Sequence, residues 1–101
     1  MSEPTLFDDL KDVQHRKYRE LLATGKGPVV LAVARSLRQP FTLNDLSVAC
    51  WRRDPAFFGM KGYQQYPDNH KIHSFLYGKR GLIARRLLDR VSEGLFRVHQ
   101  T

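Results

Sequence analysis

The sequence predicts a mainly α-helical domain that ends in a small β-hairpin. Apolar residues recur with helical spacing over three stretches between residues 5 and 54, and again after Asp68. Residues 88–98 instead alternate apolar and charged side chains around a glycine, which is typical of two antiparallel strands. A chain of 101 residues can bury one modest core. We therefore expect one mainly α-helical unit.

The N-terminal stretch predicts an amphipathic helix that stands apart from the rest. Residues 5–24 carry leucines and a valine at helical spacing, and Gly25, followed by Pro28, ends the segment. We expect residues 1–25 to form an N-terminal amphipathic helix and residues 26–101 to form the main domain.

The main domain begins with two predicted helices. Residues 29–37 are apolar on most sides, which places this helix in the middle of the core. Phe41 and Thr42 form a short extended piece. Thr42 and Asp45 have the spacing of a capping box, so a helix begins there, and it ends before Pro55.

A loop and a further helix are expected next. Residues 55–67 are rich in aromatic residues and glycine, which predicts a loop. Asp68 caps a helix over residues 69–77, and the side chains expected to face the core are Ile72, Phe75 and Leu76. Residues 82–88 are compatible with either a helical turn or the start of a strand.

The C-terminal segment carries the clearest local pattern. Residues 88–98 predict a β-hairpin with a glycine where a positive φ angle is needed. By alternation, Arg90 and Arg97 share one face of this hairpin. Val91 and Val98 occupy the other face.

The order helix, short extended piece, helix, helix and β-hairpin resembles the winged helix-turn-helix superfamily. The resemblance covers about residues 28–99 and rests on Pro-Phe-Thr-Leu-Asn-Asp-Leu (40–46), Asp-Asn-His-Lys-Ile-His-Ser-Phe-Leu-Tyr (68–77) and the segment 81–98. It implies that the helix after Asp68 enters the major groove and that the hairpin, or wing, contacts the DNA backbone or minor groove. One departure is the long insert, residues 55–67, where a turn of about 3–4 residues is usual.

The predicted DNA-binding residues fall into two sets. The outward face of the recognition helix offers groups for base edges and phosphates, namely Asn69, His70, Lys71, His73, Ser74 and Tyr77. Basic side chains after this helix are expected to bind phosphates, namely Lys79, Arg80, Arg85, Arg86, Arg90 and Arg97. If these six contacts form, affinity depends on salt with a logarithmic slope of roughly −5.

The charge distribution favours a polyanionic partner. The net charge is +7, yet residues 1–25 contain four basic and five acidic side chains. The remaining residues contain 13 basic and five acidic side chains, so the positive excess lies after Gly25. Double-stranded DNA is therefore the expected partner, with transcription regulation as one role. An intracellular location, in cytoplasm, nucleoid or nucleus, and a homodimer reading two half-sites are consistent with it.

Two alternatives stay open. A winged helix can serve as a protein-interaction module for an acidic partner, which the long aromatic insert favours. Binding of single-stranded or structured RNA requires the insert's aromatic side chains to be exposed. The favoured hypothesis for the insert is that Phe57 and Phe58 extend the core while Tyr63 and Tyr66 pin the loop.

No pattern in the sequence indicates an enzyme, a cofactor or a metal. Phosphate loops and nucleophile motifs are lacking. His70 and His73 are three residues apart, but no further ligands complete a zinc site. Cys50 and Trp51 are interpreted as packing residues, and a single cysteine fits a reducing compartment. No apolar run approaches the roughly 20 residues of a membrane span, and the N-terminus does not resemble a signal peptide.

Overall fold

The computed structural model describes residues 25–100, which form a small α/β domain with four helices and two small antiparallel sheets. The predicted N-terminal helix lies outside these residues. The elements are α2 (Gly27–Ser36), β1 (Phe41–Thr42), α3 (Leu43–Arg53), α4 (Pro55–Phe58), β2 (Gly59–Met60), β3 (Tyr63–Pro67), α5 (Asn69–Leu76), β4 (Leu88–Ser92) and β5 (Leu95–Val98). The coarse prediction of a mainly α-helical domain with a C-terminal hairpin is confirmed.

Helix α2 packs one face into the core and leaves another exposed. Val30, Val33 and Ala34 are buried, whereas Ala32 is exposed. The prediction that this helix lies in the middle of the core is therefore wrong for the face that carries Ala32. A domain of this size has too few elements to cover a helix all round. Pro28 stands in the first turn, where its missing N–H costs nothing.

Helix α3 begins with the predicted capping box. The Asp45 backbone N–H donates to Thr42 Oγ1 (3.1 Å), and the Thr42 N–H donates to Asp45 Oδ2 (3.0 Å). The helix ends at Arg53, before Pro55. Cys50 is fully buried on its inner face, and burial raises the pKa of this thiol to about 12.

A three-stranded sheet joins the two ends of the domain. Its strand order is β1-β5-β4, and Phe41 of β1 lies opposite Phe96 of β5. The two rings are 6.4 Å apart and both are buried. The short extended piece before α3 therefore serves as an edge strand for the C-terminal hairpin.

Residues 55–67 are not the loop that the composition predicts. Pro55–Phe58 form the single turn α4, because the Asp54 carboxylate accepts a hydrogen bond from the Phe57 N–H (3.2 Å). Strands β2 and β3 follow as a second hairpin. All residues of β3 from Tyr63 to Tyr66 are exposed, so this hairpin buries no apolar face and shows no alternation in sequence.

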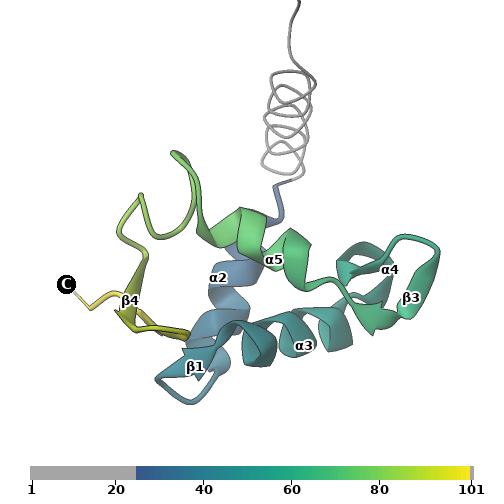
Figure 1. Ribbon diagram of the computed structural model, residues 1–101, viewed down its shortest axis with the longest axis horizontal. Coiled ribbons are helices and arrows are strands. Elements are labelled where there is room, and N and C mark those ends of the chain that lie inside the picture. The colour runs from purple at the N-terminus through teal and green to yellow at the C-terminus, as the bar shows by residue number, and fades with distance from the viewer. Residues whose placement is uncertain (1–24, 101) are drawn as a thin grey trace, which may run out of the picture.

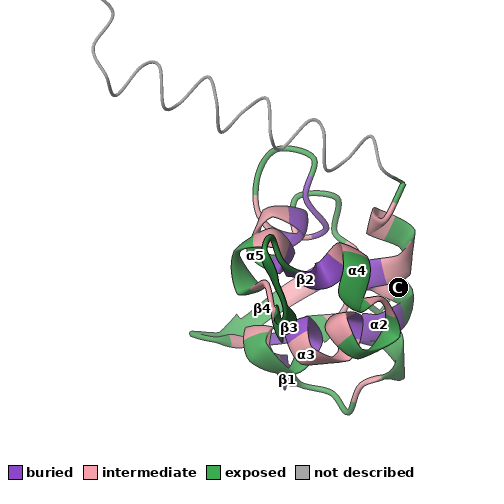
Figure 2. Ribbon diagram, turned by 90° about the vertical axis from the view of Figure 1, so that its right-hand side faces the viewer, coloured by how far each residue is buried: buried purple, intermediate pink, exposed green. Residues whose placement is uncertain are grey.

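The core lies where α2, α3 and α5 meet the three-stranded sheet. Its buried side chains are Val30, Val33, Ala34, Phe41, Leu46, Cys50, Phe58, Ile72, Phe75, Leu76, Leu82, Leu88 and Phe96. In Figure 1 the two hairpins lie at opposite sides of this core, with α5 between them. Figure 2 shows buried residues on the inner faces of the helices and exposed residues along the β2–β3 hairpin.

Candidate nucleic-acid interface

Helix α5 presents the outward face that the sequence predicts. The Lys71 N–H donates to Asp68 Oδ1 (3.1 Å), so Asp68 is the N-cap. Ile72, Phe75 and Leu76 are buried, as predicted. His70 and His73 are exposed on the opposite side, where they are accessible to a partner.

Lys71 does not project to solvent as the sequence prediction required. Its Nζ donates to the backbone oxygen of Phe57 at 2.6 Å and lies 4.7 Å from the centre of the Phe57 ring. Both contacts are with Phe57, a residue of the insert. The spacing of residues along α5 gives no information about such a tertiary contact. Lys71 therefore links α5 to α4 and is removed from the set of base-reading side chains.

Two further predicted residues of α5, and Tyr77 directly after it, already make contacts within the domain. Asn69 Nδ2 donates to Asn44 Oδ1 (2.7 Å), and Ser74 Oγ donates to the His70 carbonyl (3.0 Å). Tyr77 is half-buried and stacks on His73 with 4.4 Å between ring centres. Asn69 stays exposed, so a base edge would compete with Asn44 for its amide.

The connection from α5 to β4, residues 77–87, is a series of turns without helix or strand. Leu82 is buried and its N–H donates to the Phe75 carbonyl (3.0 Å). Gly81 passes so close to α5 that a Cβ there would meet the Leu76 carbonyl oxygen at 2.5 Å. This connection is therefore fixed against the end of α5.

Exposed basic side chains project from this connection. Lys79, Arg80, Arg85 and Arg86 are all exposed. Within residues 25–100 none of them has a carboxylate within 4.0 Å, and the same holds for Arg90 on β4. These five residues, here called the cationic set, concentrate uncompensated positive charge between α5 and the C-terminal hairpin.

Arg97 does not belong with Arg90, contrary to the prediction from strand alternation. Arg90 lies opposite Phe96, whereas Arg97 lies opposite Asp89, so the two arginines occupy opposite faces. The offset between the two strands decides which residues share a face, and alternation within each strand does not fix it. Arg97 Nε is 3.7 Å from Asp89 Oδ2, and His99 Nδ1 lies 2.9 Å from the same atom.

The prediction that Val91 and Val98 share the other face of the hairpin is also wrong. The register shifts between Arg90 and Ser92, so Val91 sits in a bulge and is 47% exposed. Val98 is half-buried against the core. The bulge lies next to the turn at Gly94, and residues 91–94 are all exposed.

The aromatic insert divides into a packed part and an exposed part. Phe58 is buried and Phe57 packs beside it, as the favoured hypothesis for the insert expected. The tyrosines do not pin the loop, because Tyr63 is 60% and Tyr66 is 56% exposed. Trp51 attaches this segment to α3 instead, because its Nε1 donates a hydrogen bond to the Gln64 carbonyl (2.8 Å).

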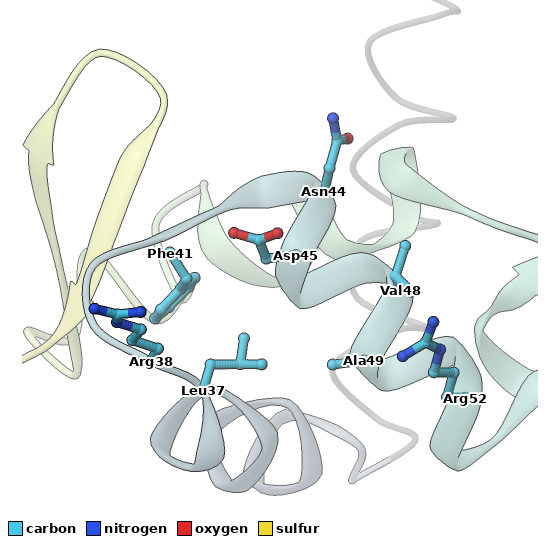
Figure 3. Close-up of a pocket in the computed structure, with 8 residues that line it drawn as sticks. All are labelled: Leu37, Arg38, Phe41, Asn44, Asp45, Val48, Ala49 and Arg52. Carbon is cyan, nitrogen blue, oxygen red and sulfur yellow. The ribbon is translucent and has the colours of Figure 1, made fainter.

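One open groove of about 520 Å³ lies on the surface between α2, β1 and α3. Leu37 and Ala49 face one another across it, with Arg38 and Arg52 toward its two ends (Figure 3). None of the predicted site residues lines it. The groove and the predicted interface are therefore different parts of the described surface.

Residues 25–100 contain no cluster of three or more histidine, cysteine, aspartate or glutamate side chains that could hold a metal ion. None of the helices among these residues has the length and hydropathy needed to cross a membrane. The chain matches no protein-family model, no curated protein and no solved structure.

Proposed function

We propose that the domain after residue 25 is a winged helix-turn-helix that binds double-stranded DNA, with transcription regulation as its role inside the cell. The observation that carries the proposal is the cationic set, which has no carboxylate partners within residues 25–100 and lies directly after α5. Uncompensated surface arginines and lysines attract phosphates and are typical of nucleic-acid interfaces.

The topology supports the same proposal. Strand β1 precedes α3 and pairs with β5 of the β4–β5 hairpin, and Tyr77, directly after α5, lies 6.2 Å from the Phe96 ring of β5. In a winged helix such a hairpin is the wing and α5 is the recognition helix. The exposed His70 and His73 would then face base edges, and the cationic set would bind the flanking phosphates.

The backbone of Arg86 adds independent support. Its φ angle is +59°, in the left-handed region that glycine adopts without strain. A side chain there costs about 1–2 kcal/mol. Arg86 is exposed, makes no ion pair within the described residues, and its backbone N–H donates to the Ile83 carbonyl (3.0 Å). A left-handed backbone at an exposed residue other than glycine motivates the hypothesis that this position serves function.

Titration of a mixed-sequence blunt duplex at increasing salt tests this proposal. The cationic set predicts a logarithmic slope of roughly −4.5, because each phosphate contact contributes about −0.9. Arg85→Ala with Arg86→Ala should weaken binding to every sequence and reduce the slope by about 2. Arg35→Ala with Arg52→Ala removes the same charge from exposed positions on α2 and α3, and is the matched control. If both double variants weaken DNA binding equally, the cationic set is not a defined DNA-binding site.

The two exposed histidines test the reading of base edges. His70→Ala and His73→Ala should lower the preference for a selected sequence over a mixed one, while the salt slope stays the same. Selection of duplexes from a random pool, with wild type and each variant, measures this preference. An unchanged selected sequence would remove α5 from the base contacts.

A protein-interaction module is the second candidate, and the exposed side chains of the insert favour it. Met60, Tyr63 and Tyr66 present apolar surface to solvent. If duplex binding is negligible even at low salt, an acidic protein partner becomes the better proposal. A homodimer on two half-sites belongs to the DNA proposal and predicts two protomers per palindromic duplex in sedimentation.

A further inference from the structure

The β2–β3 hairpin carries most of the exposed apolar surface of the described domain. Four large hydrophobic side chains among residues 25–100 are clearly exposed, and three of them, Met60, Tyr63 and Tyr66, belong to this hairpin. Single exposed hydrophobic residues are common, but a cluster indicates a binding surface. Met60 lies directly opposite Tyr63 in the strand pairing.

The hairpin is held by backbone contacts, and its large hydrophobic side chains are mostly exposed. Gly59 passes so close to its neighbours that a Cβ would meet the Pro55 and Gln64 carbonyl oxygens at 2.5 and 2.7 Å. Trp51 Nε1 binds the Gln64 carbonyl, and the Asp68 N–H donates to the Phe58 carbonyl (2.9 Å). These backbone contacts orient the exposed side chains with respect to α3 and α5.

An irregular register pushes part of the hairpin outward. Gly59 pairs with Pro67 while the next residue, Met60, pairs with Tyr63, so residues 64–66 lie opposite a single peptide bond. Tyr66 belongs to this bulge. Residues 59–66 contain no acidic side chain, and Lys61 stands exposed at the tip. The hairpin therefore exposes two aromatic rings, a methionine and one positive charge, and Met60 and Tyr63 are cross-strand neighbours.

We propose that this hairpin surface, formed by Met60, Lys61, Tyr63 and Tyr66, binds unpaired bases of a DNA strand that continues from the duplex on α5. This inference rests on the proposed DNA-binding function. Exposed rings stack on bases only where the bases are unpaired, because a duplex covers both base faces. Lys61 would bind the adjoining phosphate.

The position of the hairpin agrees with this partner. The hairpin precedes α5 and lies on the other side of α5 from the β4–β5 hairpin, so a strand that continues past α5 away from the cationic set would run toward it (Figure 1). Because residues 59–66 contain a lysine and no carboxylate, this surface fits an anionic partner better than a cationic one. The ligand is thus a junction of double-stranded and single-stranded DNA.

Fluorescence anisotropy with three labelled DNAs tests the proposal. These are a blunt duplex, the same duplex with a short thymidine overhang, and the duplex with an abasic overhang of equal length. The abasic overhang keeps the phosphates and lacks the bases. Wild type should bind the thymidine overhang on the order of tenfold more tightly than the abasic one, because stacking on an aromatic side chain has an effect of this size per base.

The matched variants are Tyr63→Leu with Tyr66→Leu, and Tyr63→Phe with Tyr66→Phe. The leucine pair should lose the preference for the thymidine overhang but keep wild-type affinity for the blunt duplex. The phenylalanine pair should keep the preference, since the ring survives. Both tyrosines are exposed, so folding should be unaffected, and the emission of Trp51 checks this.

Failure of each proposal gives a different result. Equal wild-type affinity for thymidine and abasic overhangs, or a leucine pair that keeps the preference, overturns the hairpin proposal and leaves duplex binding intact. Binding of the thymidine overhang with no binding of the blunt duplex supports base stacking by the hairpin and overturns the winged-helix mode of duplex binding.

Discussion

The two hairpins of this domain have the same topology but are stabilised in different ways. The β4–β5 hairpin buries Leu88 and Phe96 in the core and pairs with β1. The β2–β3 hairpin leaves its side chains exposed and is attached through backbone carbonyls, close contacts at Gly59 and a tryptophan N–H. Side-chain burial holds the first, and backbone contacts hold the second.

This difference shows why the two hairpins differ in what their surfaces can do. In the first, the side chains that face the core are fixed by packing, and function is left to the charges on the outside and at the turn. In the second, the side chains of residues 60–66 are all exposed and therefore accessible to a partner. The predictions below compare equivalent changes in the two hairpins.

The largest expected difference in stability is between two variants that each remove one aromatic ring, one in each hairpin. Phe96→Ala should lower the free energy of unfolding by about 4 kcal/mol, because the ring is buried against Phe41 and Tyr77. Tyr66→Ala should change it by less than about 0.5 kcal/mol. Urea denaturation measures both. Similar losses in the two variants would show that the β2–β3 hairpin contributes side-chain packing after all.

The next effect concerns the close backbone approach that holds the β2–β3 hairpin. Gly59→Ala should cost about 2–3 kcal/mol, since its Cβ would meet backbone atoms that cannot move aside. Gly27→Ala is the control, because a Cβ there meets nothing within 4 Å and the helix gains a better former. Thermal unfolding measures both variants. A wild-type Tm for Gly59→Ala would mean that the hairpin is loosely attached.

A smaller effect is expected from Trp51→Phe, which removes the hydrogen bond to the Gln64 carbonyl. The loss should be about 1 kcal/mol and should fall mainly on the β2–β3 hairpin. Amide hydrogen exchange should accelerate in residues 63–66 while the amides of β4 and β5 keep their rates. Uniform acceleration throughout the domain would indicate that both hairpins open together.

The smallest effect on stability distinguishes the two arginines of the β4–β5 hairpin. Arg90→Ala and Arg97→Ala should each change stability by less than about 1 kcal/mol, because both side chains are exposed and a surface ion pair contributes little. Their effects on DNA should differ. Arg90→Ala should reduce the salt slope by about 0.9, whereas Arg97, held beside Asp89, should leave it nearly unchanged. Equal reductions would contradict the assignment of the two arginines to different faces.

Local sequence rules predicted the parts of the fold in which one face is buried or one cap is formed. The Thr42–Asp45 capping box, the Asp68 cap and the inward face of α5 follow from spacing alone. The presence of the β4–β5 hairpin also follows from the sequence, whereas the faces of its residues depend on the strand offset and did not. The β2–β3 hairpin could not be found this way, because it buries no face.

The candidate site was predicted less well than the fold, because side chains choose partners in three dimensions. Lys71 turns to the Phe57 carbonyl and Arg97 to Asp89, and both partners depend on tertiary contacts or strand offset. The four basic residues of the connection were found from composition and stay exposed. The contact of Trp51 with Gln64 had no signal in the sequence beyond the presence of a tryptophan.

The buried thiol of Cys50 allows the opening of the core to be measured by thiol labelling. It is the single cysteine of the chain, it is fully enclosed by the core, and its pKa of about 12 keeps it protonated in the native state. Only the thiolate reacts rapidly with alkylating reagents, so labelling must wait until the core opens. The labelling rate at neutral pH therefore measures core opening in each variant without any added probe.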